Sequence, residues 1–362
     1  MRIAQVLYSL EMGGQEMMAL HLTRELLQRG HEVVVVTMSP GGSLRPDFAP
    51  ARVVDALRKP EAGIDPRAWP TMFRAFRDIR PHVVHTHAPG PLLYAVPAAR
   101  LAGVRRVVHT SHGANITQLN PRSIALGRAI VRLLARFVPV SDETAETARS
   151  REKVPEHLIQ VIPNGIPLDR FGPDEAARAT IRAELGIPAD AFVVGTVGRV
   201  EAVKNHKLFV ASMAKIVSPG IHAVIVGPGS LEAEVRASIP EPARPYIHMT
   251  GARRDVPALL AAFDVFTLTS ITEGLPLVVP EAMATELPVV ATAVGSLPTI
   301  VPKDTGILVP SGDEAGLTAA YTRLRENPRA RKEMARAART FANARFSLAK
   351  MVDAYEQIYR DG

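Results

Sequence analysis

Short runs of β-branched and apolar residues alternate with helix-period segments along nearly the whole chain of 362 residues. The predicted strands span residues 3–9, 31–37, 82–87, 106–110, 137–140 and 159–163 in the first half, and 192–197, 223–226, 247–250, 265–269, 288–292 and 306–309 in the second. Residues 16–29 have helical periodicity and precede Gly30, a residue type common just past helix C-termini. Strands that alternate with helices in this way form parallel sheets covered on both faces. The sequence therefore predicts an α/β fold.

The chain is long for one compact core, and its length favours two domains. Proline and glycine concentrate between residues 163 and 188, and a boundary near residues 164–174 leaves six predicted strands on each side. We expect one domain over residues 1–167, a second over residues 168–345, and a terminal helix over residues 346–362. Both domains are predicted to be Rossmann-like and doubly wound, facing one another across a cleft, with ligands at the carboxyl ends of their strands.

The net positive charge of the chain comes entirely from its first half. Residues 1–167 hold 21 Lys and Arg against 14 Asp and Glu, whereas residues 168–362 hold 22 of each. Two predicted helical segments carry many of these cations: Arg67, Arg74, Arg77 and Arg80 on one, and Arg122, Arg128, Arg132 and Arg136 on the other. The excess indicates either solvated helix faces or attraction to an anionic membrane surface or pyrophosphate-bearing acceptor. Nucleic acid is a disfavoured partner, because aromatic residues make up only 5% of the chain.

Compartment and membrane signals are weak in this sequence. There is no cysteine, and no apolar run approaches the roughly 20 residues of a spanning helix. The opening residues, MRIAQVLYSL, have no small-residue cleavage site and predict a first strand rather than a leader. We expect a cytoplasmic protein whose basic half is compatible with peripheral binding to the inner face of a membrane.

Two carboxylates stand eight positions apart in the segment SITEGLPLVVPEAMA, which follows a predicted strand. Glu273 lies in the loop with Gly274 and Leu275, and Glu281 falls in the opening turns of a predicted helix. The unpaired N–H groups and positive dipole end of a helix N-terminus favour phosphate at such a position. Carboxylates repel phosphate, so carboxylates beside a phosphate site are better suited to bind neutral hydroxyls. The segment therefore predicts a nucleotide-sugar site.

Cations and glycines follow other predicted strands. Arg199 and Lys204 come just after the strand at residues 192–197, where they could neutralise a diphosphate, although an isolated pair would more often be plain surface cations. Gly13 and Gly14 lie between the first strand and first helix, which allows either close approach of a ligand or simply a tight turn. The loop at 226–229 resembles a dinucleotide fingerprint, but Glu232 stands at the third glycine position and disfavours NAD. Other polar positions, Asp264, residues 253–255 and residues 164–165, are predicted near the same rim, each more typical of a cap or turn than a contact.

Several histidines lie on or beside two consecutive predicted strands: His82, His85, His87, His109 and His112. His85 and His87 share a strand face, but the spacing matches no standard zinc site, so no metal is predicted. His112 precedes Gly113 at the carboxyl end of its strand, where it could donate a hydrogen bond to a ligand in the cleft. A core or supporting role is the alternative for His112 and the preferred interpretation for the others.

Taken in order, these segments resemble the retaining glycosyltransferases of family four, which have the GT-B fold. The resemblance covers almost the whole length and rests on six segments: VLYSLEMGGQEMMALHLTRELLQRGHEVVVVT, HVVHTH, VVHTSHG, QVIPNGIPLDRF, VGRVEAVKNHKLFV and TEGLPLVVPEAMA. It implies that the first domain binds the acceptor, that the second binds the donor, and that the helix near residues 348–359 crosses back to the first.

The resemblance also implies roles for individual residues. Arg199 and Lys204 would bind the donor diphosphate, helped by backbone N–H groups near Gly274 and Leu275. Three further side chains, Glu281, Glu273 and His112, would hold the ribose, the hydroxyls of the donor sugar, and another sugar hydroxyl near the reacting centre. The anomeric configuration would be retained, and no metal or other cofactor would be needed. The substrate would be a UDP-, GDP- or ADP-linked hexose-type sugar, and the acceptor, lipid-linked or otherwise anionic, would belong to surface-glycan or polysaccharide assembly.

The sequence departs from the family pattern at three positions. Ser296 stands where a second glycine often follows Gly295, Thr299 stands in place of a common glutamate, and Pro228 replaces a common aspartate. These departures leave the donor-sugar selectivity open. Three other functions also remain open: a nucleotide-sugar 2-epimerase of the same architecture, a glycoside hydrolase using Glu273 and Glu281 as an acid/base pair, and a non-catalytic sugar-binding protein.

Overall fold

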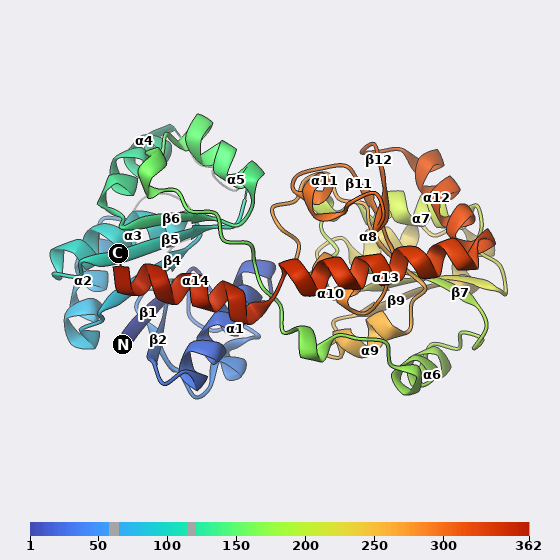
Figure 1. Ribbon diagram of the computed structural model, residues 1–362, viewed down its shortest axis with the longest axis horizontal. Coiled ribbons are helices and arrows are strands. Elements are labelled where there is room, and N and C mark those ends of the chain that lie inside the picture. The colour runs from blue at the N-terminus through green and yellow to red at the C-terminus, as the bar shows by residue number, and fades with distance from the viewer. Residues whose placement is uncertain (58–64, 114–120, 362) are drawn as a thin grey trace. The chain divides into compact units, whose positions relative to one another are not determined.

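A computed structural model of the protein describes residues 1–57, 65–113 and 121–361. The chain forms two compact units, one comprising Met1–Ile166 with Leu348–Gly362, and the other Pro167–Ser347. Each unit contains a six-stranded sheet whose strand pairs are all parallel. Helices cover both faces of each sheet (Figure 1). The predicted fold class, two Rossmann-like α/β domains, is confirmed.

The first unit is a sheet with strand order β3-β2-β1-β4-β5-β6. Its strands are β1 (Arg2–Leu7), β2 (Glu32–Thr37), β3 (Arg52–Asp55), β4 (Val83–His87), β5 (Arg106–Ser111) and β6 (Arg136–Pro139). Its helices are α1 (Gly14–Gln28), α2 (Ala68–Ile79), α3 (Pro89–Leu101), α4 (Pro121–Ile130), α5 (Asp142–Thr147) and α14 (Leu348–Asp361). The strand order reverses between β1 and β4, which makes that edge a topological switch point of the kind where doubly wound sheets bind ligands.

The second unit repeats this topology with strand order β12-β11-β10-β7-β8-β9. Its strands are β7 (Phe192–Val197), β8 (Ile221–Val226), β9 (Ile247–Gly251), β10 (Val265–Leu268), β11 (Val289–Thr292) and β12 (Gly306–Val309). Its helices are α6 (Glu175–Glu184), α7 (His206–Ala214), α8 (Glu232–Ala237), α9 (Val256–Ala261), α10 (Val278–Ala284), α11 (Leu297–Ile300), α12 (Glu314–Glu326) and α13 (Pro328–Arg345). Here the switch point lies between β7 and β10.

The predicted strand at residues 159–163 is wrong, and β3 was not predicted. Only a single bridge joins Ile159 to Phe137, although Gln160 and Ile162 donate backbone hydrogen bonds to Phe137 and Pro139 of β6. Pro139 ends β6 and has no N–H group, so the ladder cannot continue along this segment. β3 escaped prediction because Arg52–Asp55 is only four residues long and has a charged residue at each end.

The last helix, α14, belongs to the first unit and packs against α1. Figure 1 shows it in red across the strands of that unit. Arg29, at the end of α1, lies 3.0 Å from a carboxylate oxygen of Glu356, and His31 contacts the other oxygen at 2.5 Å. Tyr355 and Tyr359 are fully buried. The first unit therefore draws its core from both ends of the described chain.

Candidate active site

Lys204 and Glu273 meet at the switch point of the second unit. Lys204 lies in the 3-10 turn Ala202–Lys204 after β7, and Glu273 lies in the loop after β10. The Nζ atom of Lys204 is 2.6 Å from Oε1 of Glu273, and their side chains are only 18% and 9% exposed. Ser270 donates a hydrogen bond to the same carboxylate oxygen. The structure therefore brings a cation and a carboxylate from two predicted segments together where a doubly wound sheet binds ligands.

Hydroxyl side chains at or just past the ends of strands hydrogen-bond to these loops. Thr269 donates to the backbone oxygens of Lys204 and Asn205, each at 3.1 Å. Thr292, the last residue of β11, donates to the backbone oxygen of Ser270 at 2.6 Å. These residues were not predicted from the sequence. Their signal is a Ser or Thr placed at or just past the end of a buried strand, where a free hydroxyl can bind a neighbouring loop.

Three glycines let the loops of neighbouring strands approach closely. A Cβ atom on Gly227 would lie 2.1 Å from the backbone oxygen of Gly198, and one on Gly229 would lie 2.2 Å from that of Val200. Gly295, with φ +56°, follows β11, and a Cβ there would lie 2.0 Å from the backbone oxygen of Glu273. The position of Glu273 therefore depends on a residue without a side chain at 295.

Gly295→Ala should displace Glu273 and destabilise the second unit. The substitution combines backbone strain with a clash against backbone that cannot rotate away, so we expect a loss of about 1–3 kcal/mol in the free energy of unfolding, measured by urea denaturation. Gly312→Ala is the matched control, because Gly312 also has positive φ (+83°) but a Cβ atom there would meet nothing within 4 Å. Equal losses in the two variants would show that the contact with Glu273 is unimportant.

Possible phosphate ligands lie around the Lys204–Glu273 pair. Arg199 is exposed, and its guanidinium makes no hydrogen bond or ion pair to any described residue. The backbone N–H groups of Gly274 and Leu275 likewise donate to nothing within the described part of the chain. Helix α10 follows but has only seven residues. The loop N–H groups, more than a long helix dipole, are what this site offers to an anion.

Glu281 is the fourth residue of α10, in the opening turns as predicted. Burial raises the pKa of its carboxyl to about 7, and the positive charge of Arg170 acts in the opposite direction. The shift has the sign expected for desolvation, which disfavours the charged form of a carboxyl. Arg170, from the segment just after the predicted domain boundary, was not identified as a neighbour of this site.

The polar residues of the first unit form a buried network. His112 follows β5, and its Nε2 atom is 3.2 Å from Nδ1 of His87 on β4. Nε2 of His87 is in turn 2.7 Å from Oε1 of Gln5 on β1. Burial lowers the pKa of His112 to about 3 and that of His87 well below its usual value. Gln5 was not identified from the sequence, since a single polar residue within an apolar strand gave no pattern.

The same network reaches α14 through His85. Nδ1 of His85 is 2.6 Å from the hydroxyl of Tyr359, and its Nε2 is 2.7 Å from Oγ1 of Thr110. Thr110 is 2.8 Å from the hydroxyl of Tyr355. Within the described residues, no group of three His, Cys, Asp or Glu side chains is arranged to hold a metal ion. The contacts with Thr110 and Tyr359 involve both ring nitrogens of His85, and a supporting role stays the interpretation that the sequence favours.

The Gly13–Gly14 turn begins α1 at the carboxyl end of β1, on the switch-point edge of the first unit. Gly13 is the N-cap residue, and its φ of −159° is extended backbone. A Cβ atom on Gly13 would lie 2.4 Å from Oε2 of Glu16, whereas one on Gly14 would meet nothing within 4 Å. The atom that would be met is the flexible end of a side chain, so this turn is compatible both with a ligand contact and with a plain tight turn.

Asp264 is not at the predicted rim. It precedes β10 and so lies at the amino-terminal end of the strands, whereas the site residues follow the carboxyl-terminal ends. Its two carboxylate oxygens are each 2.8 Å from a guanidinium nitrogen, one of Arg178 and one of Arg182. Asp264 is a structural residue of the second unit.

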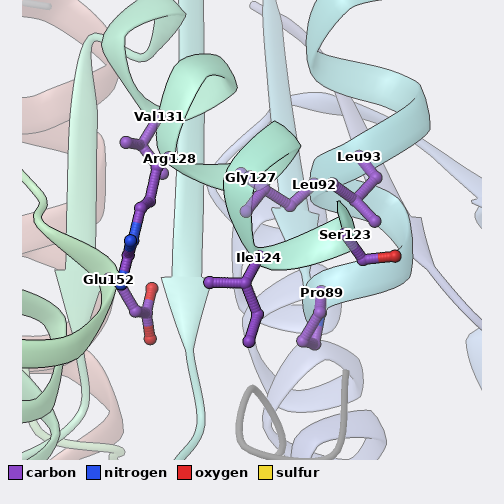
Figure 2. A pocket seen from close by; sticks show the side chains of 9 residues that line it. All are labelled: Pro89, Leu92, Leu93, Ser123, Ile124, Gly127, Arg128, Val131 and Glu152. Atoms are coloured by element: carbon purple, nitrogen blue, oxygen red, sulfur yellow. The ribbon is translucent and has the colours of Figure 1, made fainter. Parts of the chain in front are cut away.

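A small apolar pocket lies in the first unit between α3 and α4. It is lined by Pro89, Leu92, Leu93, Ser123, Ile124, Gly127, Arg128, Val131 and Glu152 (Figure 2). Figure 2 shows Glu152 and Arg128 along the same side of it. Burial raises the pKa of Glu152 to about 7. None of the predicted site residues lines this pocket.

Two family models match the chain, one in each unit. The model described as Glycosyltransferase Family 4 matches residues 12–170, and the model described as Glycosyl transferases group 1 matches residues 191–327. A 2-deoxystreptamine N-acetyl-D-glucosaminyltransferase from Streptomyces fradiae is 30% identical over 349 residues, covering 85% of this chain and 81% of the relative. The chain belongs to glycosyltransferase family 4. It is therefore an enzyme of the transferase class, as the resemblance implied.

A further relative of this glycosyltransferase has a lipid-linked acceptor in its name. An Escherichia coli protein named UDP-Gal:alpha-D-GlcNAc-diphosphoundecaprenol alpha-1,3-galactosyltransferase is 28% identical over 82% of this chain and 80% of its own length. Among solved structures, Anabaena HepE in complex with UDP and glucose has a TM-score of 0.86 at 21% identity, with 99% of both chains covered. This likeness supports the GT-B fold. Among the described helices of the transferase, none is long and apolar enough to cross a bilayer.

Proposed function

We propose that the protein is a retaining, metal-independent hexosyltransferase that uses a nucleotide-diphosphate sugar as donor. The observation that carries this proposal is the Lys204–Glu273 pair at the switch point of the second unit, 2.6 Å apart and largely buried. The N–H groups of Gly274 and Leu275 lie in the same loop and donate to none of the residues that the structure describes. A cation with unpaired donors suits a diphosphate, and a carboxylate beside them suits sugar hydroxyls.

In this proposal the second unit binds the donor. Lys204 and Arg199 neutralise the diphosphate, and the N–H groups at residues 274 and 275 hydrogen-bond its oxygens. Glu281 binds the ribose, and Glu273 binds the donor sugar. Lys204 is paired with Glu273 before the donor arrives, so its charge is already fixed in place when the phosphates bind. Preorganised donors of this kind stabilise the negative charge that develops on the departing nucleotide without a metal ion.

The first unit binds the acceptor and supplies His112, which contacts another sugar hydroxyl near the reacting centre. The acceptor hydroxyl attacks on the face that the leaving group occupies, and a phosphate oxygen of the leaving group takes its proton. The anomeric configuration of the transferred sugar is thereby retained. The Gly13–Gly14 turn gives a close approach to the donor.

We further propose a lipid-linked or otherwise anionic acceptor in surface-glycan assembly, at the inner face of the membrane. The excess of seven positive charges in residues 1–167 supports this assignment. The name of the Escherichia coli relative, whose acceptor is linked to diphosphoundecaprenol, supports it as well. The basic residues do not all lie on helices, since Arg132 is in the 3-10 turn Val131–Leu133 and Arg136 begins β6.

Binding of one nucleoside diphosphate should raise the melting temperature of the protein, with or without EDTA. At a ligand concentration of 100 times Kd the native state gains about 2.7 kcal/mol. We would screen UDP, GDP and ADP and then assay transfer from the matching sugar conjugate to a diphosphate-lipid acceptor and to a neutral sugar. The anomeric configuration of the product is read by proton NMR. UDP is the first choice because both the Escherichia coli relative and HepE carry it in their descriptions.

Lys204→Ala should remove the thermal shift, whereas Lys207→Ala, which breaks an exposed pair with Glu234, should keep it. A shift that disappears in EDTA would contradict metal independence. An inverted product would contradict the mechanism, and transfer to the neutral sugar alone would contradict the acceptor. No shift with any of the three nucleotides would contradict the donor site itself.

A further inference from the structure

The hydrogen bonds of His112 determine which of its nitrogens can face a substrate. Its Nε2 atom is hydrogen-bonded to Nδ1 of His87 at 3.2 Å. Within the described part of the chain His112 has no other hydrogen-bond partner, so Nδ1 remains for a ligand. Whether Nδ1 is a donor or an acceptor depends on the position of the single ring proton.

The position of that proton can be worked out from Gln5. In this structure the side-chain amide of Gln5 is oriented with its carbonyl oxygen 2.7 Å from Nε2 of His87, while its nitrogen is buried and makes no hydrogen bond to a described residue. In this orientation the amide can only accept a hydrogen bond from His87. With the amide in this orientation His87 carries its proton on Nε2, which leaves Nδ1 as an acceptor towards His112. His112 must then donate from Nε2, and its own Nδ1 carries a lone pair.

Both imidazoles are neutral, so each carries one proton and the chain of hydrogen bonds has a single direction. Burial lowers the pKa of both rings far below neutrality. Gln5 and His87 are fully buried, so their side chains cannot exchange these hydrogen bonds for hydrogen bonds to solvent. The rings of His85 and His87 also pack with centroids 4.3 Å apart, which restricts rotation of His87.

We propose that Gln5, acting through His87, fixes His112 in the tautomer with its proton on Nε2 and so presents Nδ1 to the substrate as a hydrogen-bond acceptor. Gln5 and His87 are positioning residues. The recognised group is then a hydroxyl that donates to Nδ1, whereas the sequence alone suggested that His112 would be the donor. A carboxylate or a fluorine at that position of the sugar could not make this bond. Only the link to substrate rests on the proposed function, because the tautomer is a property of the unliganded protein.

The direct test is nitrogen NMR of ¹⁵N-histidine-labelled protein at pH 7 without ligand, with the His112 signals assigned by their loss in His112→Gln. We expect a protonated Nε2 and an unprotonated Nδ1. In Gln5→Met the acceptor for His87 is lost, so the His112 signals should move towards a mixture of the two tautomers. Thr86→Val is the matched control, because Thr86 makes a similar buried bond to Nδ1 of His109 at 2.9 Å outside this chain of hydrogen bonds.

A wild-type spectrum with the proton on Nδ1, or an unchanged spectrum in Gln5→Met, would overturn the proposal. The wild-type measurement decides the matter even if Gln5→Met does not fold. For transfer, Gln5→Met should lower kcat by about ten-fold, the value of one hydrogen bond, with little change in KM for the donor. A mixed tautomer with unchanged kcat would overturn the link to substrate, while failure of the proposed function would leave the spectra as expected.

Discussion

Glu273→Ala is expected to lower kcat for sugar transfer by roughly 10²–10³-fold, the range seen when one preorganised electrostatic contact is removed from an active site. In the proposed mechanism Glu273 holds the donor sugar, so its loss affects the sugar in the transition state more than the nucleotide. Removing it also releases Lys204 from the 2.6 Å pair, which leaves that cation free for the diphosphate. Affinity for the nucleoside diphosphate should therefore change little.

The measurement pairs steady-state kinetics with calorimetric titration of the nucleoside diphosphate. Glu234→Ala is the control, because it removes a glutamate from an exposed pair with Lys207 in the same unit and should leave kcat unchanged. Ser270→Ala provides an intermediate case, since Ser270 donates to Glu273 without being proposed to touch the sugar. If Glu273→Ala kept full kcat but lost nucleotide affinity, the roles of Glu273 and Lys204 would have been assigned wrongly.

Asp264→Ala should destabilise the second unit by about 3–5 kcal/mol, because it leaves the buried guanidinium of Arg182 without a counter-charge. Arg182 is only 2% exposed, and burial lowers the pKa of its guanidinium. Asp264 also accepts a hydrogen bond from the backbone N–H of Val193 at 2.8 Å, so the substitution removes a contact at the start of β7 as well. Urea denaturation followed by circular dichroism would measure the loss.

Asp255→Ala is the control for charge alone, because Asp255 pairs with Arg253 near the surface and its side chain is 42% exposed; its effect should stay within about 1 kcal/mol. Arg182→Met in the Asp264→Ala background should recover part of the stability, since it removes the unpaired charge. Similar losses for Asp264→Ala and Asp255→Ala would show that burial of Arg182 contributes nothing.

The fold was predictable because its signal is repeated along the chain. Eleven of the predicted strand runs overlap observed strands, and the misplaced one lies beside Pro139, where the ladder lacks an N–H donor. The alternation of strands and helices can be recognised from the local sequence, without knowing which segments meet in the fold. Short edge strands such as β3 carry little of that signal, since four residues with charged ends are compatible with a loop.

The candidate site was predictable only in part. Lys204 and Glu273 follow strands, and the position of a residue relative to a strand end is visible in the sequence. Asp264 was misplaced because it precedes its strand, and residues before and after a parallel strand lie at opposite edges of the sheet. Gln5 was missed for a different reason. Its effect depends on which strand lies beside β1, and that neighbour, β4, is about eighty residues later in the chain.

The membership of α14 in the first unit has a consequence for the order in which the protein can fold during synthesis. Every residue of Pro167–Ser347 leaves the ribosome before Leu348 does, so the second unit can fold while the first still lacks its last helix. At ribosomal rates this interval is on the order of 10–40 s. During that time the residues that contact Tyr355 and Tyr359, including His85, are not yet buried by α14. The nascent first unit thus presents an incomplete core that must be protected from aggregation, whereas the second unit matures without waiting for it.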